Sequence, residues 1–379
     1  LPFLFIVGRP RTGTTLLRVI FDAHPNVIVP PECQFVVNLY SKYGRKKFWD
    51  VLLLERFIRD LAGQWRIEMW NLEEDQLRRN LYALQGKHSY GDICKAVYAS
   101  YPSLFPNDGL KLLGDKNPGY TIYTRRLLKI FPDARFIYIN RDYRDNYVSI
   151  REVGFDLAIP SLPAQKWKYF YRKIHRDAAL NPSRYHFVRY EDLVMRPEET
   201  VRGLCTFSGI PYHPAMLEYH HKKEEFTRDY PPGVLQKYHS GITHGIYTHR
   251  LEIWRERLTP RQVRLLDATV GKLAAEAGYG NSYPGGVSAA ALAALPGRFL
   301  AAGLAIATRV VDKLPARVRM NILSKGPRAL AMLIYRIFRP QKLEAIRRER
   351  PYLLPFRRNS SRNPFVSATA VLPRTKEEV

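Results

Sequence analysis

The hydrophobic pattern at the start of the chain predicts a buried strand, a tight loop and a helix. Residues 4–7 (LFIV) form a continuous apolar run, as expected of a strand that is buried on both faces. Residues 14–23 carry apolar side chains at helical spacing, and Gly8 and Gly13 bound the loop in between. This arrangement predicts an anion site, because the N–H groups of the first helical turn converge there and the helix dipole favours negative charge.

The same pattern repeats along the chain and predicts an α/β fold. Further strands are predicted from apolar runs at residues 27–29, 110–114, 135–139 and 185–188. Helical patterns alternate with them, at about 118–131, 141–150 and 162–180. Strands that alternate with helices indicate a parallel sheet, so we expect a three-layer sheet flanked by helices, like that of the P-loop NTPases.

Two other regions complete the predicted organisation. Residues 1–285 form the α/β domain, with a mostly helical insertion at about 33–101. The insertion carries no catalytic motif, and we interpret it as scaffold or as a wall of an acceptor pocket. Residues 286–379 form a basic helical C-terminal extension and tail.

Three predicted loops follow strands at the same edge of this sheet. Gly8, Asp115 and Arg141 each come directly after the carboxyl end of a predicted strand. In open parallel sheets, ligands bind in the crevice outside the carboxyl ends of the strands. We therefore expect all three loops to line one crevice.

The first loop has the Gly-x-x-x-x-Gly spacing of a Walker A motif, but Thr14 and Thr15 follow it in place of Lys and Ser or Thr. Its cations lie inside the loop, at Arg9 and Arg11. A P-loop kinase or GTPase also needs an acidic Mg²⁺ ligand after a second strand, whereas the best later strand runs into Arg141. These residues indicate phosphate binding without a metal. The alternative is an ordinary βα turn with a good N-cap.

A second anion site is predicted at Arg141 and Ser149. Arg141 lies at a strand end, and Ser149 lies about two turns along the next helix. A guanidinium and a hydroxyl that converge there are suited to a second phosphate. Asp142 and Asp145 cap the helix and orient the arginines, so a salt bridge in the first helical turn is the alternative.

The net charge of +25, with a pI near 10, points to a polyanionic partner, an anionic membrane surface or anionic ligands. The three cysteines are far apart and form no C-x-x-C motif, which favours a reducing compartment over a disulfide scaffold or a zinc site. We expect a cytoplasmic location with peripheral contact to a membrane. Because the chain begins at Leu1, an upstream signal or anchor stays open.

Two phosphate sites on one nucleotide, without a metal, suggest 3′-phosphoadenosine 5′-phosphosulfate (PAPS). The chain resembles the PAPS-dependent sulfotransferases: GRPRTGTTLLR is similar to the family's 5′-phosphosulfate loop, and INRDYRDNYVS to its 3′-phosphate motif. Supporting matches are DAHPNVIVPPE, DKNP and FVRYEDLV. The resemblance covers about residues 3–280 and is closest to the branch that includes the tyrosylprotein sulfotransferases and related bacterial enzymes.

The resemblance implies a role for each residue of the crevice. Glu32 is the expected base for the acceptor proton, Arg11 is expected to contact the 5′-phosphate and the leaving oxygen, and Lys116 is expected to neutralise the sulfuryl oxygens. The residues expected to bind PAPS, and the product 3′-phosphoadenosine 5′-phosphate (PAP), are Arg9, Pro10, Arg11, Thr12, Gly13, Thr14, Thr15, Arg141, Ser149, Tyr190 and Ser240. The alternatives are a dipole-stabilising acid for Glu32 and a salt bridge to Asp115 for Lys116.

The segment at 236–250 departs from the resembling branch. That branch places a Ser and then a Lys here, and this chain supplies Ser240 without a Lys at the matching spacing. Lys237 or Arg250 is the expected substitute. Histidines recur every five residues, at His239, His244 and His249, which suits neither a helix face nor a strand face, so we expect no metal site.

The C-terminal extension concentrates charge. Residues 288–379 hold 18 Lys and Arg and 5 Asp and Glu, a net of +13. Helical patterns at 288–314 and 316–338 are apolar stripes interrupted by arginines. The apolar run at 299–307 is expected to be too short to span a bilayer. We therefore expect the extension to dock on the catalytic domain and to present a basic, partly apolar surface to a membrane or an anionic acceptor; the alternative is a solvated helical pair.

The leading hypothesis is an enzyme that transfers the sulfuryl group of PAPS to an acceptor hydroxyl. A P-loop nucleotide kinase is the weaker alternative, since the Walker lysine and the acidic Mg²⁺ ligand are missing. A basic adaptor for nucleic acid or a membrane surface would explain the tail but not the two anion motifs. The acceptor stays open between sugar, peptide tyrosine, lipid and small alcohol, and no nucleic-acid partner is expected.

Overall fold

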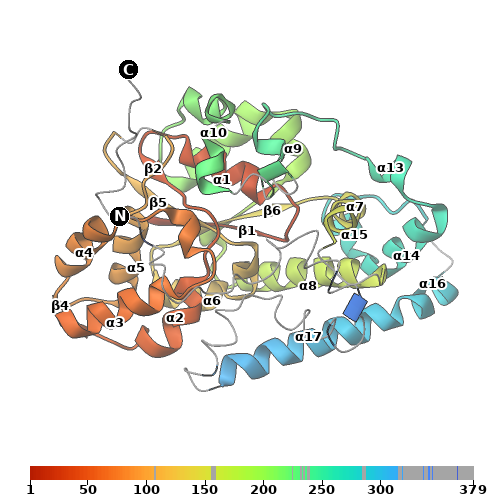
Figure 1. Cartoon of the computed structure of the whole chain (residues 1–379). Helices are drawn as coiled ribbons and strands as arrows, with labels where there is room; N and C mark the ends of the chain where they lie inside the picture. Colours follow the sequence, from red (N-terminus) through yellow and green to blue (C-terminus); the bar gives the residue numbers. More distant parts are fainter. Residues whose placement is uncertain are drawn as a thin grey trace.

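Five parallel strands form the central sheet of the computed structural model, in the order β2-β5-β1-β6-β7 (Figure 1). Their bounds are β1 Phe3–Gly8, β2 Val27–Ile28, β5 Leu112–Lys116, β6 Arg135–Asn140 and β7 Tyr185–Arg189. Helices cover both faces of the sheet (Figure 1). The predicted three-layer α/β fold is therefore confirmed.

The structure describes residues 1–105, 108–154, 159–223, 225–230, 233, 235–236, 240–283 and 287–314, together with residues 318, 336, 340, 341, 344 and 365. The predicted helix at 316–338 lies almost entirely outside the described residues.

Strand β1 lies at the centre of the sheet, between β5 and β6, and all six of its residues are buried. Because side chains alternate along a strand, Phe5 joins one hydrophobic cluster while Leu4 and Ile6 join the cluster on the opposite face. Phe5 stacks on Phe136 of β6, with ring centroids 5.2 Å apart. The continuous apolar run seen in the sequence is thus explained by burial on both sides.

One face of the sheet carries α1, α9 and α10, and the other carries α6, α8 and α14 (Figure 1). Helix α7 lies at the carboxyl ends of the strands and packs against α8 and α14. The bounds of these helices are α1 Thr14–Asp22, α6 Thr124–Ile130, α7 Tyr143–Val153, α8 Ser161–Ala178, α9 Tyr190–Met195, α10 Pro197–Ser208 and α14 Pro260–Val270.

The segment between β2 and β5 is mostly helical, and it adds a small two-stranded sheet that the sequence pattern did not indicate. Its helices are α2 Phe35–Tyr43, α3 Val51–Ala62, α4 Glu74–Tyr82 and α5 Tyr90–Ala99. This sheet pairs β3 (Phe48–Trp49) antiparallel with β4 (Gly86–Lys87). Two residues per strand are too few to produce a readable alternation. The interior of the segment is aromatic, with Trp49 and Trp70 fully buried.

The position of β5 corrects one sequence prediction. We expected a strand at 110–114 and placed Asp115 and Lys116 in the following loop, but β5 is Leu112–Lys116 and includes both residues. The strand accommodates two buried charged groups because each has polar partners within reach. As neighbours on a strand, the two side chains point to opposite faces of the sheet.

Shorter helices complete the described chain. The α-helices are α11 Phe226–Asp229, α13 Trp254–Arg257, α15 Leu273–Glu276, α16 Val287–Ala293 and α17 Leu295–Lys313. The 3₁₀ helices are η1 Ile67–Trp70, η2 Pro118–Ile122, η3 Pro182–Arg184, η4 Pro214–Met216, η5 Tyr219–Lys222 and η6 Ser240–Ile242. Helix α17 packs along α8 on the outside of the molecule, and α16 packs against α14 (Figure 1).

Among the described residues, one helix is long and apolar enough to cross a membrane by length and composition: the 25 residues Ala289–Lys313. The prediction that the apolar part of the extension is too short to span a bilayer is therefore wrong. It considered only the unbroken run at 299–307, whereas alanines and leucines extend the apolar stretch toward the N-terminus.

Candidate functional site

The loop between β1 and α1 has a backbone that only particular residues tolerate. Gly13 has φ +95°, and a Cβ there would lie 2.5 Å from Cδ2 of Tyr190. Arg11 also adopts a left-handed conformation, with φ +72°, which is uncommon for a residue other than glycine. At Gly8 a Cβ would lie 2.6 Å from the carbonyl oxygen of Ile139. The loop is thus a tightly constrained turn that lies directly against β6 and α9.

Side chains from two other elements, and one from the loop itself, hold this loop in place. Thr121 in η2 accepts a hydrogen bond from the Gly8 N–H at 3.0 Å, and its hydroxyl lies 2.9 Å from the Gly8 carbonyl oxygen. The Asn146 amide of α7 donates to the carbonyl oxygen of Pro10 at 2.9 Å. Within the loop, Thr12 donates to the carbonyl oxygen of Arg9 at 2.8 Å. A loop fixed in this way is preorganised, so binding an anion requires little reordering.

Helix α1 begins at Thr14 without a side-chain cap and without an acidic residue in its first turn. Its first N–H groups are therefore not satisfied by a capping side chain, and the positive end of its dipole is not neutralised locally. Thr15 adds a hydroxyl at the same place. This is the geometry in which helix N-termini bind anions, so the anion site stays a prediction that the backbone permits.

The predicted second anion site is assembled as a cluster of basic residues. Nε of Arg11 donates to Oγ of Ser149 at 3.0 Å, so the loop and α7 meet directly. Arg141 lies at the end of β6, stacks over the ring of Tyr190 with its guanidinium carbon 4.5 Å from the centroid, and donates to the carbonyl oxygen of Arg250 at 2.5 Å. Arg11, which was expected to serve the 5′-phosphate, thus lies with the residues expected to serve the 3′-phosphate.

This cluster has a hydrogen-bond donor without a partner among the described residues, and its positive charges repel one another. Nε of Arg141 is buried and has no hydrogen-bond partner among the described residues. Burial, followed by the positive charges of Arg141 and Arg250, lowers the pKa of Arg11 to about 10. Packing like charges in a buried place is unfavourable, and a bound phosphate would relieve both the repulsion and the unmet N–H.

The acidic residues beside Arg141 are used by other partners. Asp142 caps α7 and binds Arg144 through both carboxylate oxygens, at 2.9 and 2.7 Å. Asp145 accepts from the N–H groups of Glu252 and Trp254, at 2.9 and 3.0 Å, and lies 3.9 Å from Arg141. These contacts pin the segment that carries Arg250 beside the cluster. The salt bridge in the first helical turn is thus present as a long Arg141–Asp145 pair, and Arg141 has its contacts with Tyr190 and Arg250 in addition.

A second constellation lies on the other side of the loop. Nζ of Lys116 lies 2.6 Å from Oε1 of Glu32 and 3.2 Å from Oγ1 of Thr15, and Arg66 binds the other oxygen of Glu32. Lys116 is only 1% exposed, whereas Glu32 is 24% exposed and open to an incoming molecule. Burial lowers the pKa of Lys116, and the charge of Glu32 opposes that effect. A carboxylate and an ammonium group thus face the first helical turn of α1.

Asp115 does not pair with Lys116, so that alternative is wrong. Asp115 points to the opposite face of the sheet, where Tyr98 donates to it and the Asn117 amide lies 2.9 Å from both of its oxygens. Burial raises the pKa of Asp115 to about 7, although the hydrogen bonds from Tyr98 and Asn117 act in the other direction. The alternation of side chains along β5 separates the two charged groups.

Some positioning residues were missed at the sequence level. Arg18 and Asp22 form a fully buried pair on α1, and they hold the backbone of Val29 through bonds of 2.7 and 2.8 Å, just before the segment that carries Glu32. Two charged residues four apart on the apolar side of a helix were the available signal. Arg66 carried no comparable signal, because it reaches Glu32 from η1, which is remote in sequence.

The remaining predicted residues fall outside the two constellations. Arg9 is buried, and its guanidinium donates to the carbonyl oxygen of Pro163 on α8. Arg9 therefore anchors the loop to α8 rather than joining the other cations.

Lys237, His239 and the side chain of Ser240 lie outside the described residues. His249 stacks on Tyr247 with ring centroids 4.0 Å apart. In the part of the chain that the structure describes, no group of three or more His, Cys, Asp or Glu is placed to hold a metal ion.

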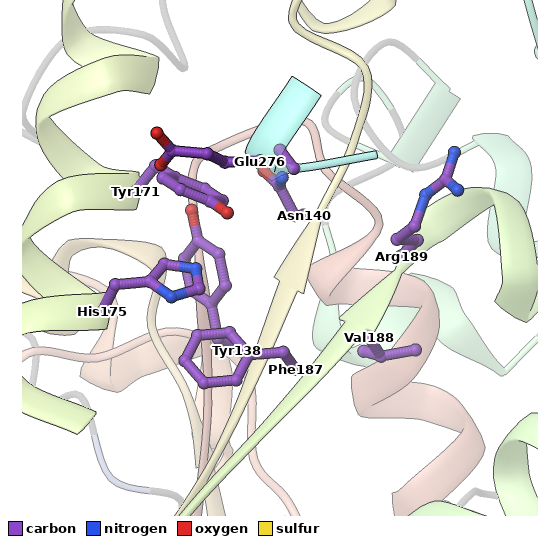
Figure 2. Close-up of a pocket in the computed structure, with 9 residues that line it drawn as sticks. Tyr138, Asn140, Tyr171, His175, Phe187, Val188, Arg189 and Glu276 are labelled. Carbon is purple, nitrogen blue, oxygen red and sulfur yellow. The ribbon is translucent and has the colours of Figure 1, made fainter. Parts of the chain in front are cut away.

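A hollow of about 160 Å³ lies on the α8 face of the sheet (Figure 2). Tyr138 and Asn140 of β6 line it, together with His175 of α8 and Glu276 of α15. Since Lys116 and Tyr190 point to the α1 face, this hollow is separate from the two constellations. The candidate site is therefore the crevice at the carboxyl ends of β1, β5 and β6.

The comparisons with known proteins agree with this geometry. Residues 2–214 match the sulfotransferase family, so the chain belongs to that family. It is 28% identical over 240 residues to a protein-tyrosine sulfotransferase of Drosophila melanogaster, covering 62% of this chain and 42% of the relative. It is also 28% identical over 228 residues to protein-tyrosine sulfotransferase 1 of Danio rerio, covering 59% of this chain and 57% of the relative. The chain thus spans about half the length of these curated relatives.

A solved structure shares the fold. The sulfotransferase domain of the Synechococcus PCC 7002 olefin synthase is similar with a TM-score of 0.52 at 23% identity, over 75% of this chain and 96% of that domain. The family match ends at residue 214, so it includes Glu32, Lys116, Arg141 and Ser149 but not Arg250 or the C-terminal extension.

Proposed function

We propose that this chain is a PAPS-dependent O-sulfotransferase. The observation that carries the proposal is that the loop and the first turn of α1 join two groups of residues: Arg11 of the loop contacts Ser149, and Thr15 of α1 contacts Lys116. A nucleotide with phosphates at both ends of its ribose needs two such sites in fixed relation. An acceptor reaction additionally needs a proton acceptor beside one of them, and Glu32 supplies it.

The residues present fit PAPS. Arg141 and Ser149 are assigned to the 3′-phosphate, because the unpartnered Nε of Arg141 provides a donor that is already buried. The N–H groups of the first turn of α1 and the hydroxyls of Thr14 and Thr15 are assigned to the 5′-phosphate. Tyr190, which lies between Gly13 and Arg141, forms a wall of the nucleotide site.

The chemical step is an in-line displacement at sulfur. The acceptor oxygen forms a bond to sulfur while the bond from sulfur to the oxygen of the 5′-phosphate breaks, and PAP leaves with that electron pair. The acceptor proton passes to Glu32. Lys116 neutralises charge on the sulfuryl oxygens, and the positive end of α1 stabilises the leaving phosphate. Arg66 holds the Glu32 carboxylate from its other side.

Peptide tyrosine is the first acceptor to test, because the curated relatives are named protein-tyrosine sulfotransferases. Sugar hydroxyls, lipids and small alcohols remain further acceptor classes. The partial exposure of Glu32 leaves its carboxylate accessible from the crevice, as the base in such a reaction must be.

Transfer of ³⁵S from labelled PAPS to a panel of acceptors tests the proposal, with the Glu32→Gln variant as the matched negative control. We expect labelled product with the wild-type chain and a large loss with the variant. A thermal-shift comparison accompanies it, in which PAP stabilises the protein and ATP with Mg²⁺ does not. Stabilisation by ATP with Mg²⁺ alone would instead support a P-loop kinase.

A further inference from the structure

Helices α16 and α17 leave a long apolar stripe on the surface of the molecule. Leu292, Phe299, Ile306 and Val310 are 65%, 73%, 58% and 54% exposed. Leu292 belongs to α16 and the other three belong to α17; their spacings of seven, seven and four residues place them on one side of the helical segment Ala289–Lys313. Large apolar side chains that are exposed together in this way mark an interaction surface, whereas single exposed ones are ordinary.

The opposite side of the helix is fixed to the catalytic domain. Ala294 and Gly297 are buried, and a Cβ on Gly297 would lie 2.6 Å from the backbone nitrogen of Leu162 at the start of α8. At the far end, Asp312 lies 3.5 Å from a guanidinium nitrogen of Arg126 on α6. By helical periodicity these residues lie opposite the apolar stripe. The stripe is therefore presented outward by a helix that is docked at both ends.

The basic residues of α17 lie on a different side of the helix from its acidic residue. Arg298, Arg309 and Lys313 are exposed and fall along one flank of the apolar stripe. The single acidic residue of α17, Asp312, faces the domain and pairs with Arg126. More positive charge lies close by on α8: burial, then the charges of Arg172 and Arg298, lowers the pKa of Lys168. Within α17, the charged residues that flank the apolar stripe are therefore all cations.

We infer that α17 is an in-plane anchor that docks this protein on an anionic lipid bilayer. An apolar stripe between the headgroups and the acyl chains, with arginine and lysine reaching the phosphates, is the arrangement of interfacial helices. A second copy of the chain would repeat the same cations across a two-fold axis, and like charges would oppose each other. The basic flank favours an anionic bilayer over such a dimer.

The docked face also argues against a helix that crosses the bilayer. Crossing would remove α17 from α8, expose Gly297 and Ala294, and carry Asp312 and Arg309 into or through the hydrocarbon. Lying in the interface preserves every one of those contacts. This inference goes beyond the sulfuryl-transfer reaction and does not depend on it.

Co-sedimentation of the full chain with vesicles tests the inference. We expect the protein to pellet with vesicles of phosphatidylcholine and phosphatidylserine at low salt, and to be released by high salt because surface attraction is screened. Replacing Arg298, Arg309 and Lys313 by Gln should reduce binding to anionic vesicles by on the order of a hundredfold, at about fivefold per basic residue. The triple variant Leu292→Asn, Phe299→Asn, Ile306→Asn should lose at least about tenfold.

The matched control replaces three apolar residues that are equally exposed elsewhere, Leu52, Leu180 and Met195, by Asn. This control should bind vesicles like the wild type, and all variants should keep the melting temperature of the wild type, which shows that they fold. Equal pelleting of the wild type and the α17 apolar variant would overturn the inference. So would a dimer by light scattering that only the α17 variants lose, or resistance of the bound protein to alkaline carbonate extraction, which would indicate a crossing helix.

Discussion

The ammonium nitrogen of Lys116 lies 2.6 Å from a carboxylate oxygen of Glu32, at the entrance to the first turn of α1. Lys116 comes from the end of β5, and Glu32 comes from the segment after β2, so two neighbouring strands of the sheet bring an acid and a base together. The pair is asymmetric, because Lys116 is buried and Glu32 is partly exposed. This asymmetry fits a lysine that serves the donor group and a carboxylate that serves the incoming acceptor.

Glu32→Gln is expected to lower turnover by ~10²–10⁴-fold while PAP affinity stays within a few-fold of wild type. The amide keeps the size of the side chain but does not take the acceptor proton. Steady-state ³⁵S transfer measures turnover, and calorimetry measures PAP affinity. Glu198→Gln, at an exposed position on α10, is the control and should behave as wild type. Turnover within a few-fold of wild type in Glu32→Gln would return Glu32 to a structural role.

The Lys116→Met variant distinguishes a catalytic role of the Lys116–Glu32 ion pair from a structural role. Replacing one member of a buried pair by an apolar side chain of similar length need not destabilise the fold when the other member keeps a partner, and here Glu32 keeps Arg66. We expect turnover to fall by about 10²–10³-fold, the range for loss of one charge-stabilising donor, with little change in melting temperature. A large drop in melting temperature with unchanged turnover of the folded fraction would show that the pair is structural.

Arg11→Ala is expected to weaken PAP binding by about tenfold or more, because a charge-assisted hydrogen bond contributes ~1.5–3 kcal/mol. Arg11 contacts Ser149 and lies in the field of Arg141 and Arg250, so it belongs to the binding cluster. Arg196→Ala, an exposed arginine on the far side of α9, is the control. Calorimetric titration with PAP compares the two variants. Equal affinity of Arg11→Ala and wild type would remove Arg11 from the nucleotide site.

Asp115→Asn is expected to change how stability depends on pH. In the folded state the pKa of Asp115 is raised to about 7, above its unfolded value of about 3.8, so the folded state holds the proton more tightly between these values. Stability from this group is therefore lost as pH rises from about 4 to 7, by at most about 1.4 kcal/mol per pH unit. The Asn variant lacks this loss.

Chemical denaturation at pH 5, 6 and 7 measures the effect as the difference in unfolding free energy between wild type and variant. The difference should shift in favour of Asp115→Asn as the pH rises. Asp133→Asn, at an exposed position beside Lys95, is the control for a change of surface charge. Parallel curves for wild type and Asp115→Asn would contradict the raised pKa.

Much of the site was predictable from sequence because its parts are local. The strand, the glycine-bounded loop and the helix that form the first part of the candidate site follow one another in residues 3–22, so their pattern can be read along the chain. Arg141 and Ser149 are brought together by one helix start, at a spacing that can be counted along the chain. Glu32 and Lys116 were found through the resemblance of their segments to a family, and the order of strands in the sheet makes them neighbours.

The parts that were missed depend on long-range packing. Arg9 and Arg11 are both cations of the same loop, yet the backbone at Arg11 is left-handed and the two side chains diverge, one to α8 and one to Ser149. Arg66 reaches Glu32 across 34 residues from a short 3₁₀ helix. The end of β5 was misplaced because charged residues usually end a strand, whereas Asp115 and Lys116 each find buried partners.

Discrimination between PAP and adenosine 5′-phosphate tests the central claim most directly, because the two ligands differ only in the 3′-phosphate. Calorimetry should show that the wild-type chain binds PAP at least about tenfold more tightly than adenosine 5′-phosphate, in line with one or more charge-assisted hydrogen bonds. In Arg141→Ala this preference should collapse, while the affinity for adenosine 5′-phosphate changes little. Equal affinity of the wild type for the two nucleotides, or a preference that persists in Arg141→Ala, would contradict the two-site account of this crevice.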